Sequence, residues 1–190
     1  MQTTEELFRL LPSRRVDVLR KAIGRRLLEV ERLFLLDVST FLEDERFTSE
    51  DFFSYNSGPA QLHFEGGEKH ILSVWPSQLS LVVMRDELRE TKYDKLYRLS
   101  DSEAAHPALK DCLGRTCEDV RIWTLREDFE SEEATEVAVS YLLSGGVELF
   151  YCIYLHGDLD SDYLLLGANV SRERVDSCVS IAQGGAIAPE

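Results

Sequence analysis

Two histidines in the first half of this sequence are spaced so that they could bind a metal ion. His63 and His70 flank the pair Gly66-Gly67, which lies between two alternating apolar runs. Such a glycine pair predicts a two-residue hairpin turn, because type I′ turns need positive φ at both central residues. That turn would place the two imidazoles opposite each other. Zinc needs at least three protein ligands and no third is evident, so the pattern favours packing.

Cys152 and His156 are the second pair with the residue types needed for chemistry, here a nucleophile and its base. Four residues along a strand end put the two side chains on one face, but no third residue is evident that would orient the imidazole. The aspartates at 158, 160 and 162 begin like a calcium loop. Tyr163 then stands where that loop needs glycine, and Asn169 where it needs glutamate.

The established sequence motifs of hydrolases, nucleotide-binding proteins and zinc proteases are missing from this sequence. It has no G-x-S-x-G, no Walker loop, no dinucleotide fingerprint and no H-E-x-x-H. We therefore expect no catalytic residues, no metal and no cofactor. The alternative is a small cytoplasmic enzyme or metal-binding protein that uses His63 and His70, or Cys152 and His156.

A short signature that occurs twice predicts how the rest of the chain is organised. Residues 19–25 read L-R-K-A-I-G-R, and residues 109–115 read L-K-D-C-L-G-R. In both halves an acidic stretch follows, and then two apolar runs around a Gly-Gly pair, at 66–67 and at 145–146. Matching order over this length indicates an internal duplication. Each copy is predicted to form a helix, a Gly-Arg turn, a strand, a loop, a hairpin and a last strand.

The shared spacing of the two signatures assigns roles to their glycines and arginines. Gly24 and Gly114 each follow a helical segment, where a left-handed C-cap is needed. Arg25 and Arg115 could bind an anion, but a carbonyl cap or a salt bridge is the favoured interpretation.

The duplication predicts an α+β fold of two tandem β-rich repeats, pseudo-symmetric, with antiparallel hairpins and a few short helices. We expect a single globular domain over residues 1–190. Its repeats are expected at about 13–85 and 106–170, with a charged connector at 86–105. The second hairpin is apolar on both faces, which predicts a central position, since such strands are normally covered on both sides.

Composition excludes several classes of partner. The 190 residues carry 21 basic and 35 acidic side chains, a net charge of −14, which argues against nucleic-acid surfaces and anionic membranes. No apolar run approaches the ~20 residues of a membrane helix, and the first residues lack a secretory signal. We therefore expect a cytoplasmic protein with reduced cysteines. These are Cys112, Cys117, Cys152 and Cys178.

Negative charge is concentrated in two stretches. Residues 37–68 contain eight acids and one base, a sum of −7, and residues 118–136 contain eight acids and two bases, a sum of −6. Acids interleaved with aromatic residues suit a protein-binding surface, because acids steer a basic partner and aromatics supply affinity. The alternative is a loop that buries its aromatics in the core. The predicted partner-binding residues are Glu43, Asp44, Glu45, Asp51, Phe52, Phe53, Tyr55, Glu127, Asp128, Glu130, Glu132 and Glu133.

The layout resembles that of small acidic cytoplasmic immunity proteins from bacterial polymorphic toxin systems. The resemblance is carried by the two L-[RK]-x-x-[IL]-G-R stretches, the alternating runs around the Gly-Gly pairs and the acidic aromatic loops. It implies a non-enzymatic protein that occludes the active site of a basic toxin, and it assigns no role to any single residue. A further alternative is a structural subunit that self-associates through its sheet edges. The oligomeric state is left open.

Overall fold

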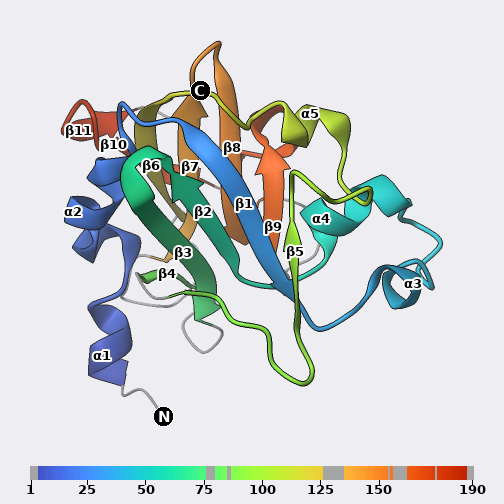
Figure 1. The fold of residues 1–190 in the computed structure, drawn as a ribbon. Helices are drawn as coiled ribbons and strands as arrows, with labels where there is room; N and C mark the ends of the chain where they lie inside the picture. The colour runs from blue at the N-terminus through green and yellow to red at the C-terminus, as the bar shows by residue number, and fades with distance from the viewer. Residues whose placement is uncertain are drawn as a thin grey trace.

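The chain forms two antiparallel sheets in a computed structural model, which describes residues 4–75, 80–84, 87–125, 135–153, 155, 162–173 and 175–187. The first sheet has the order β4-β3-β2-β1-β5 and the second the order β11-β10-β6-β7-β8-β9 (Figure 1). The strands of the first sheet are β1 (Leu27–Phe34), β2 (Ala60–Phe64), β3 (Glu68–Trp75), β4 (Ser80–Met84) and β5 (Lys95–Arg98). Those of the second are β6 (Cys117–Leu125), β7 (Glu136–Leu143), β8 (Val147–Ile153), β9 (Asp162–Leu166), β10 (Val175–Ser180) and β11 (Gly185–Ile187).

The helices are short and lie between or beside the strands. They are α1 (Thr4–Phe8), α2 (Val16–Leu19), α3 (Val38–Phe41), α4 (Phe52–Tyr55) and α5 (Pro107–Lys110), with single 3₁₀ turns among them. Two β-rich units with few helical residues confirm the predicted α+β fold.

The two sheets repeat each other strand for strand. Strands β1 to β5 correspond to β6 to β10, with the same neighbours and the same antiparallel directions, and β11 has no counterpart. A bulge between Leu27 and Glu29 recurs between Cys117 and Asp119, 90 positions further on. A bulge is a local feature that random similarity would not reproduce at the same place, so the match supports the duplication.

Each repeat extends beyond the predicted boundary by one strand. Strand β5 lies in the segment expected to be a connector, and β10 lies after residue 170. Both are fastened in the same way, because Leu99 N donates to Val30 O at 2.8 Å and Ile181 N to Val120 O at 2.9 Å. The acid at each bulge adds a bond to the same segment: Glu29 Oε1 accepts from Ser100 N, and Asp119 Oδ1 accepts from Ala182 N.

The two signature segments pair with each other about a pseudo-twofold axis. Gly24 N donates to Cys117 O, and Gly114 N donates to Leu27 O, at 2.8 and 2.7 Å. Both glycines have φ of +81°, the left-handed conformation predicted for them. The repeats are thus joined by main-chain hydrogen bonds as well as by their side chains.

Both hairpin turns contain three residues, and the two-residue turn expected from the sequence is wrong. Phe64 pairs with Glu68 across the turn Glu65–Gly67, and Leu143 pairs with Val147 across residues 144–146. The extra residue leaves a turn carbonyl that the signature arginine binds. Arg25 Nη1 donates to Glu65 O at 2.8 Å. Arg115 Nη1 donates to Ser144 O at 2.7 Å, so both arginines cap carbonyls.

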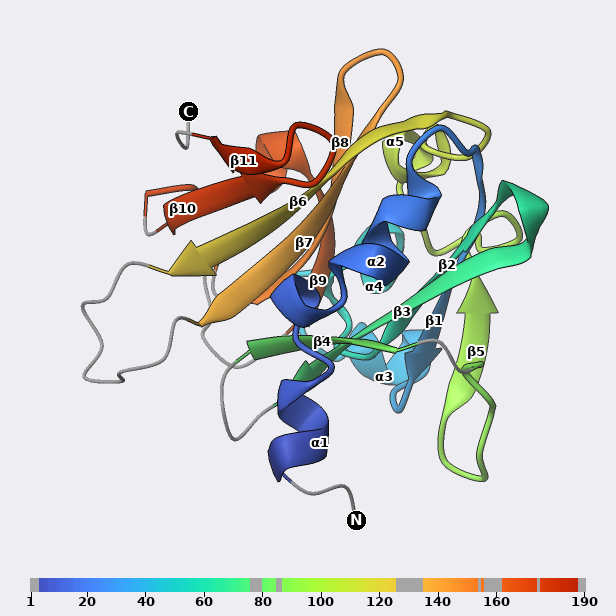
Figure 2. The same ribbon diagram turned by 90° about the vertical axis from the view of Figure 1, so that its left-hand side faces the viewer.

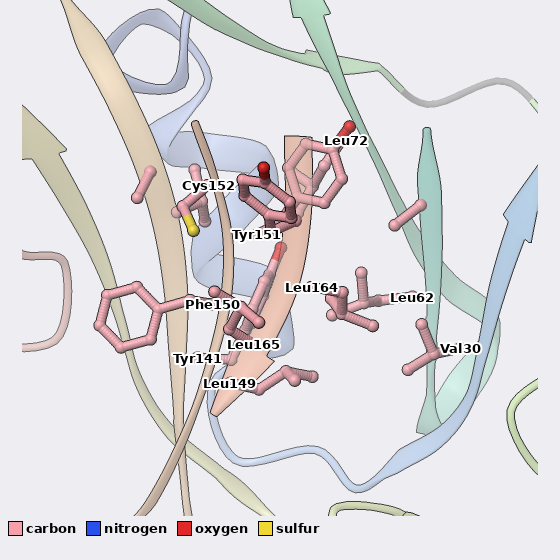
Figure 3. Packing of buried hydrophobic residues seen from close by; sticks show 14 of the residues in the cluster. Val30, Leu62, Leu72, Tyr141, Leu149, Phe150, Tyr151, Cys152, Leu164 and Leu165 are labelled. Atoms are coloured by element: carbon pink, nitrogen blue, oxygen red, sulfur yellow. The ribbon is translucent and has the colours of Figure 1, made fainter. Parts of the chain in front are cut away.

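The core lies between the inner faces of the two sheets. Val30, Leu62 and Leu72 of the first sheet face Leu149 and Leu164 of the second, and all five are buried (Figure 3). Strand β4 lies against β7 and β8, as the second view of the ribbon shows (Figure 2). Burying a leucine of this kind contributes about 1.5–3 kcal/mol.

Candidate protein-interaction surface

The main difference between the repeats is the connection that follows their first strand. Residues 35–59 join β1 to β2 and contain α3 and α4, whereas residues 126–135 join β6 to β7. The first connection therefore has 25 residues and the second has 10, although both join the same pair of strands. We call residues 35–59 the insertion. It carries six acids and one base, a net charge of −5.

The aromatic side chains of the insertion fasten it to the sheets. Phe52 and Phe53 are fully buried, and both pack edge-on against Phe34 of β1. Tyr55 is half-buried against Tyr163 of β9, with ring centroids 5.7 Å apart. Phe52 and Phe53, predicted to contact a partner, are core residues in this structure, because the sheet offers them an apolar surface. Of the three predicted aromatics only Tyr55 is partly accessible.

Leucines of the insertion are exposed instead. Leu35 is 67% exposed, Leu36 42% and Leu42 38%, and Tyr93, just before β5, is 70% exposed. These four residues are called the apolar end below. Leu35 and Leu36 directly follow Phe34, which pairs with Lys95 at the start of β5, and Tyr93 lies two residues before Lys95. Leu42 follows α3, further along the insertion. Figure 1 shows α3 beyond the end of β1 and β5 beside that end.

The apolar end holds four of the six large hydrophobic side chains that are exposed among the described residues. The other two, Leu28 and Val179, lie on β1 near its start and on β10. Single exposed apolar residues are common, whereas several within one part of the chain make that part a candidate contact surface.

Three acids of the insertion are used to hold its own backbone. Asp37 caps α3 by accepting from Thr40 N at 2.9 Å and from Ser39 Oγ at 2.8 Å. These hydrogen bonds lower the pKa of Asp37 to about 2. Asp51 accepts from Thr48 N at 2.8 Å in a capping box. The pKa of Asp44 is lowered by its hydrogen bonds from Arg46, whose Nη2 lies 2.6 Å from Asp44 Oδ2. These carboxylates are already engaged.

The remaining acids of the insertion point to solvent. Glu43 and Glu45 are exposed, and their carboxylates make no hydrogen bond or ion pair with any described residue. Glu50 is exposed, and its Oε2 lies 3.9 Å from His106 Nε2. Glu43 directly follows the exposed Leu42, so the insertion presents unengaged carboxylates next to an exposed apolar side chain, a combination that suits a basic protein.

A buried ion pair fixes the base of the insertion. Arg32 of β1 is fully buried and donates to Phe53 O and Gly58 O, each at 2.7 Å. Its Nη2 also lies 3.0 Å from Asp162 Oδ2 of β9, which accepts from Tyr151 Oη at 2.7 Å. Burial lowers the pKa of Arg32 and raises that of Tyr151. Arg32 of the first sheet therefore holds the insertion at Phe53 and at Gly58, and its ion pair with Asp162 connects it to the second sheet.

The second predicted acidic group lies outside the described residues, so the structure assigns it no position. It comprises Glu127, Asp128, Glu130, Glu132 and Glu133.

His63 and His70 are not brought together by the fold. With the three-residue turn, His63 pairs with Lys69 and His70 pairs with Leu62, which puts the imidazoles on opposite faces. His63 Nε2 lies 2.7 Å from Glu31 Oε2 on the outer face, while His70 is buried and bonded to the hydroxyl of Tyr141. The described residues contain no group of three metal-ligating side chains.

The cysteines are buried free thiols. All four are unpaired with one another, as predicted. Burial raises the pKa of Cys152, which opposes formation of the thiolate that a nucleophile needs. His156, its proposed base, lies outside the described residues, and Asp162 of the calcium-like series binds Arg32 instead.

No family model, curated protein or solved structure matches this chain. Within the described residues, no helix has the length and apolar character needed to cross a membrane.

Sequence reasoning missed the apolar end. The available signal was the pair Leu35-Leu36, which continues the apolar run of β1 directly into the helix cap at Asp37. Two adjacent leucines cannot both face the core from a strand, because successive side chains alternate between faces.

Proposed function

We propose that this protein is a non-enzymatic binding module that binds a basic partner protein through the apolar end and the neighbouring carboxylates Glu43 and Glu45. The observation that carries the proposal is that residues 35–42 and Tyr93 supply four of the six large hydrophobic side chains exposed in the described part of the chain, and that the unengaged acids Glu43 and Glu45 follow Leu42 directly. Apolar contact supplies affinity, and the acids raise the rate of encounter with a basic surface.

Local order also favours a binding role. The insertion is held by the buried phenylalanines, by two capped helical turns and by Arg32, so its exposed side chains lose little freedom when a partner binds. Preorganisation of this kind preserves affinity that would otherwise be lost to ordering. In the immunity-type form of the proposal, the partner is a basic toxin domain in the cytoplasm whose active site the protein occludes.

The test uses the full chain as bait in a lysate of its native cells, with mass spectrometry to identify the captured protein. Binding constants are then measured for Leu35→Asp and Leu42→Asp against the matched control Leu28→Asp, a leucine that is 49% exposed near the start of β1. We expect each test variant to weaken binding at least tenfold, and the control to leave it unchanged. Equal effects of all three variants would refute the proposed surface.

The contribution of charge is tested separately. The double variant Glu43→Lys/Glu45→Lys should slow association and flatten its dependence on salt, with little change in dissociation. Glu118→Lys/Glu173→Lys is the control, since both acids are exposed and lie in the second repeat. If the control slows association as much as the test variant, the acids act through net charge alone.

A further inference from the structure

Strand β5 ends the first sheet with one side unpaired. It packs mainly against β1, with Arg32 opposite Tyr97 and Phe34 opposite Lys95. Leu33 N donates to Pro59 O on the side of β1 that faces β2. The main-chain N–H and C=O groups of Arg32 and Phe34 therefore face β5. In an antiparallel ladder the bonded positions alternate. The main-chain groups of Leu96 and Arg98 therefore point away from β1.

The same edge is occupied in the second repeat. Arg98 pairs with Glu31, and Ser180 pairs with Arg121, 90 positions after Glu31, so Ser180 is the counterpart of Arg98. Strand β11 adds to β10 there, pairing Ile187 with Cys178, the counterpart of Leu96. The chain returns as β11 after β10, whereas after β5 it leaves towards α5. The fold thus accepts an added strand at this edge.

A side chain occupies part of the free edge. Glu90 Oε1 accepts from Leu96 N at 3.0 Å, as the carbonyl of a neighbouring strand would. Arg98 O is bonded to Ser102 N at 3.0 Å, just as Ser180 O is bonded to Gly184 N at 3.1 Å beside β11. Among the described residues, none donates to Leu96 O. One exposed carboxylate therefore covers the edge that β11 covers in the other repeat.

We propose that an extended segment of the basic partner adds to β5 as an antiparallel strand and displaces Glu90 from Leu96 N–H. This inference rests on the proposed function and specifies its mode of binding. The edge is continuous with the apolar end, because Tyr93 lies two residues before Lys95 and Leu35 follows Phe34, the partner of Lys95. The carboxylate released from Leu96 then faces a basic segment, which gives the displaced group a new partner.

The decisive comparison is Arg98→Pro against Arg98→Ala. Both remove the side chain that binds Glu31, but only proline removes the outward N–H. Proline is accepted on edge strands where that N–H faces solvent, and an unchanged circular dichroism spectrum will check the fold. The probe is a decapeptide of alternating lysine and valine, titrated into ¹⁵N-labelled protein, with an alternating glutamate and valine peptide as the charge control.

We expect the basic peptide to shift the amide signals of Leu96 and Arg98 most, with at least tenfold weaker binding to Arg98→Pro than to Arg98→Ala. Glu90→Ala should bind the peptide severalfold more tightly. The inference is overturned if those amides do not shift, if the acidic peptide binds equally well, or if proline and alanine behave alike. It is also overturned if Glu90→Ala forms dimers in sedimentation without binding peptide, which would make Glu90 only a guard against self-pairing.

The two proposals fail separately. If Leu35→Asp weakens binding of the captured partner while Arg98→Pro and Arg98→Ala bind it equally, the apolar end stands and strand addition is wrong. If only Arg98→Pro weakens binding, the edge is the site and the apolar end is not.

Discussion

Replacing Arg32 by methionine should destabilise the protein far more than the loss of an exposed arginine. The guanidinium is fully buried and bonds Phe53 O, Gly58 O and Asp162 Oδ2 at 2.7 to 3.0 Å. Methionine fills much of the space but leaves the Asp162 carboxylate buried without its cation. Breaking a buried pair from one side typically costs about 3–5 kcal/mol.

Comparing the two single variants with the double variant tests whether the cost comes from the unpaired charge. Asp162→Asn leaves Arg32 buried without an anion and should cost a similar amount. The double variant Arg32→Met/Asp162→Asn leaves no unpaired charge, so its loss should be smaller than the sum of the single losses. The assay is urea unfolding at neutral pH, which gives the free energy of unfolding and its denaturant slope for each variant.

Arg26→Met is the control, because Arg26 and its partner Glu65 are both about half exposed and such pairs contribute little. The reasoning would be refuted if Arg32→Met cost less than about 1 kcal/mol. It would also be refuted if the two single losses simply added in the double variant.

Further predictions concern a glycine, the thiols and pH. Gly58→Ala should destabilise by about 1–3 kcal/mol or more in the same urea assay, because its Cβ would lie 2.0 Å from Leu33 O. A thiol reagent should count four thiols in denatured, unreduced protein and react slowly with the folded chain. Burial raises the pKa of Cys112 to about 11, so stability should be complete below the unfolded thiol value of ~8.5 and fall as pH rises towards 11. Capping lowers the pKa of Asp37 to about 2, so its contribution should be present above pH ~4 and be lost as pH falls towards 2.

Each of these has a clear contrary result. Unchanged stability of Gly58→Ala would mean that the chain relaxes around the added methyl group. A count of two thiols or fewer would indicate a disulfide. The alkaline and acid effects are read from unfolding midpoints. Cys112→Ser should flatten the alkaline limb, and Asp37→Asn should flatten the acid limb, if the assignments are right.

The repeats could be predicted from the sequence because the residues that identify them act on the backbone next to them. Gly24 and Gly114 need a left-handed backbone at the end of a helical turn, and glycine is the residue that adopts it without strain. The length of the hairpin turns could not be predicted, because Gly66-Gly67 suits turns of two or three residues. The three-residue turn is accompanied by a contact with Arg25, which binds the Glu65 carbonyl from 40 positions away. A contact of that separation leaves no local pattern.

Two aromatic side chains of the insertion that were predicted to contact a partner are buried, and leucines of the same segment are exposed instead. The insertion contains both phenylalanines and leucines, and composition does not say which of them meets the sheet. Phe52 and Phe53 reach the core because α4 lies over Phe34, while Leu35 and Leu36 lie just beyond the end of the strand. That division depends on where β1 ends, which is the least predictable feature of an element.

The pairing of Gly24 with Cys117, and of Gly114 with Leu27, has the geometry of an isologous dimer contact within one chain. Two identical subunits joined in this way would display every surface twice and could bind two partners. Only the first repeat contains the 25-residue insertion, and in the second repeat β11 covers the edge of β10 that corresponds to the free edge of β5. The proposed surface therefore occurs once in the molecule, and a complex formed there should contain one partner for each chain.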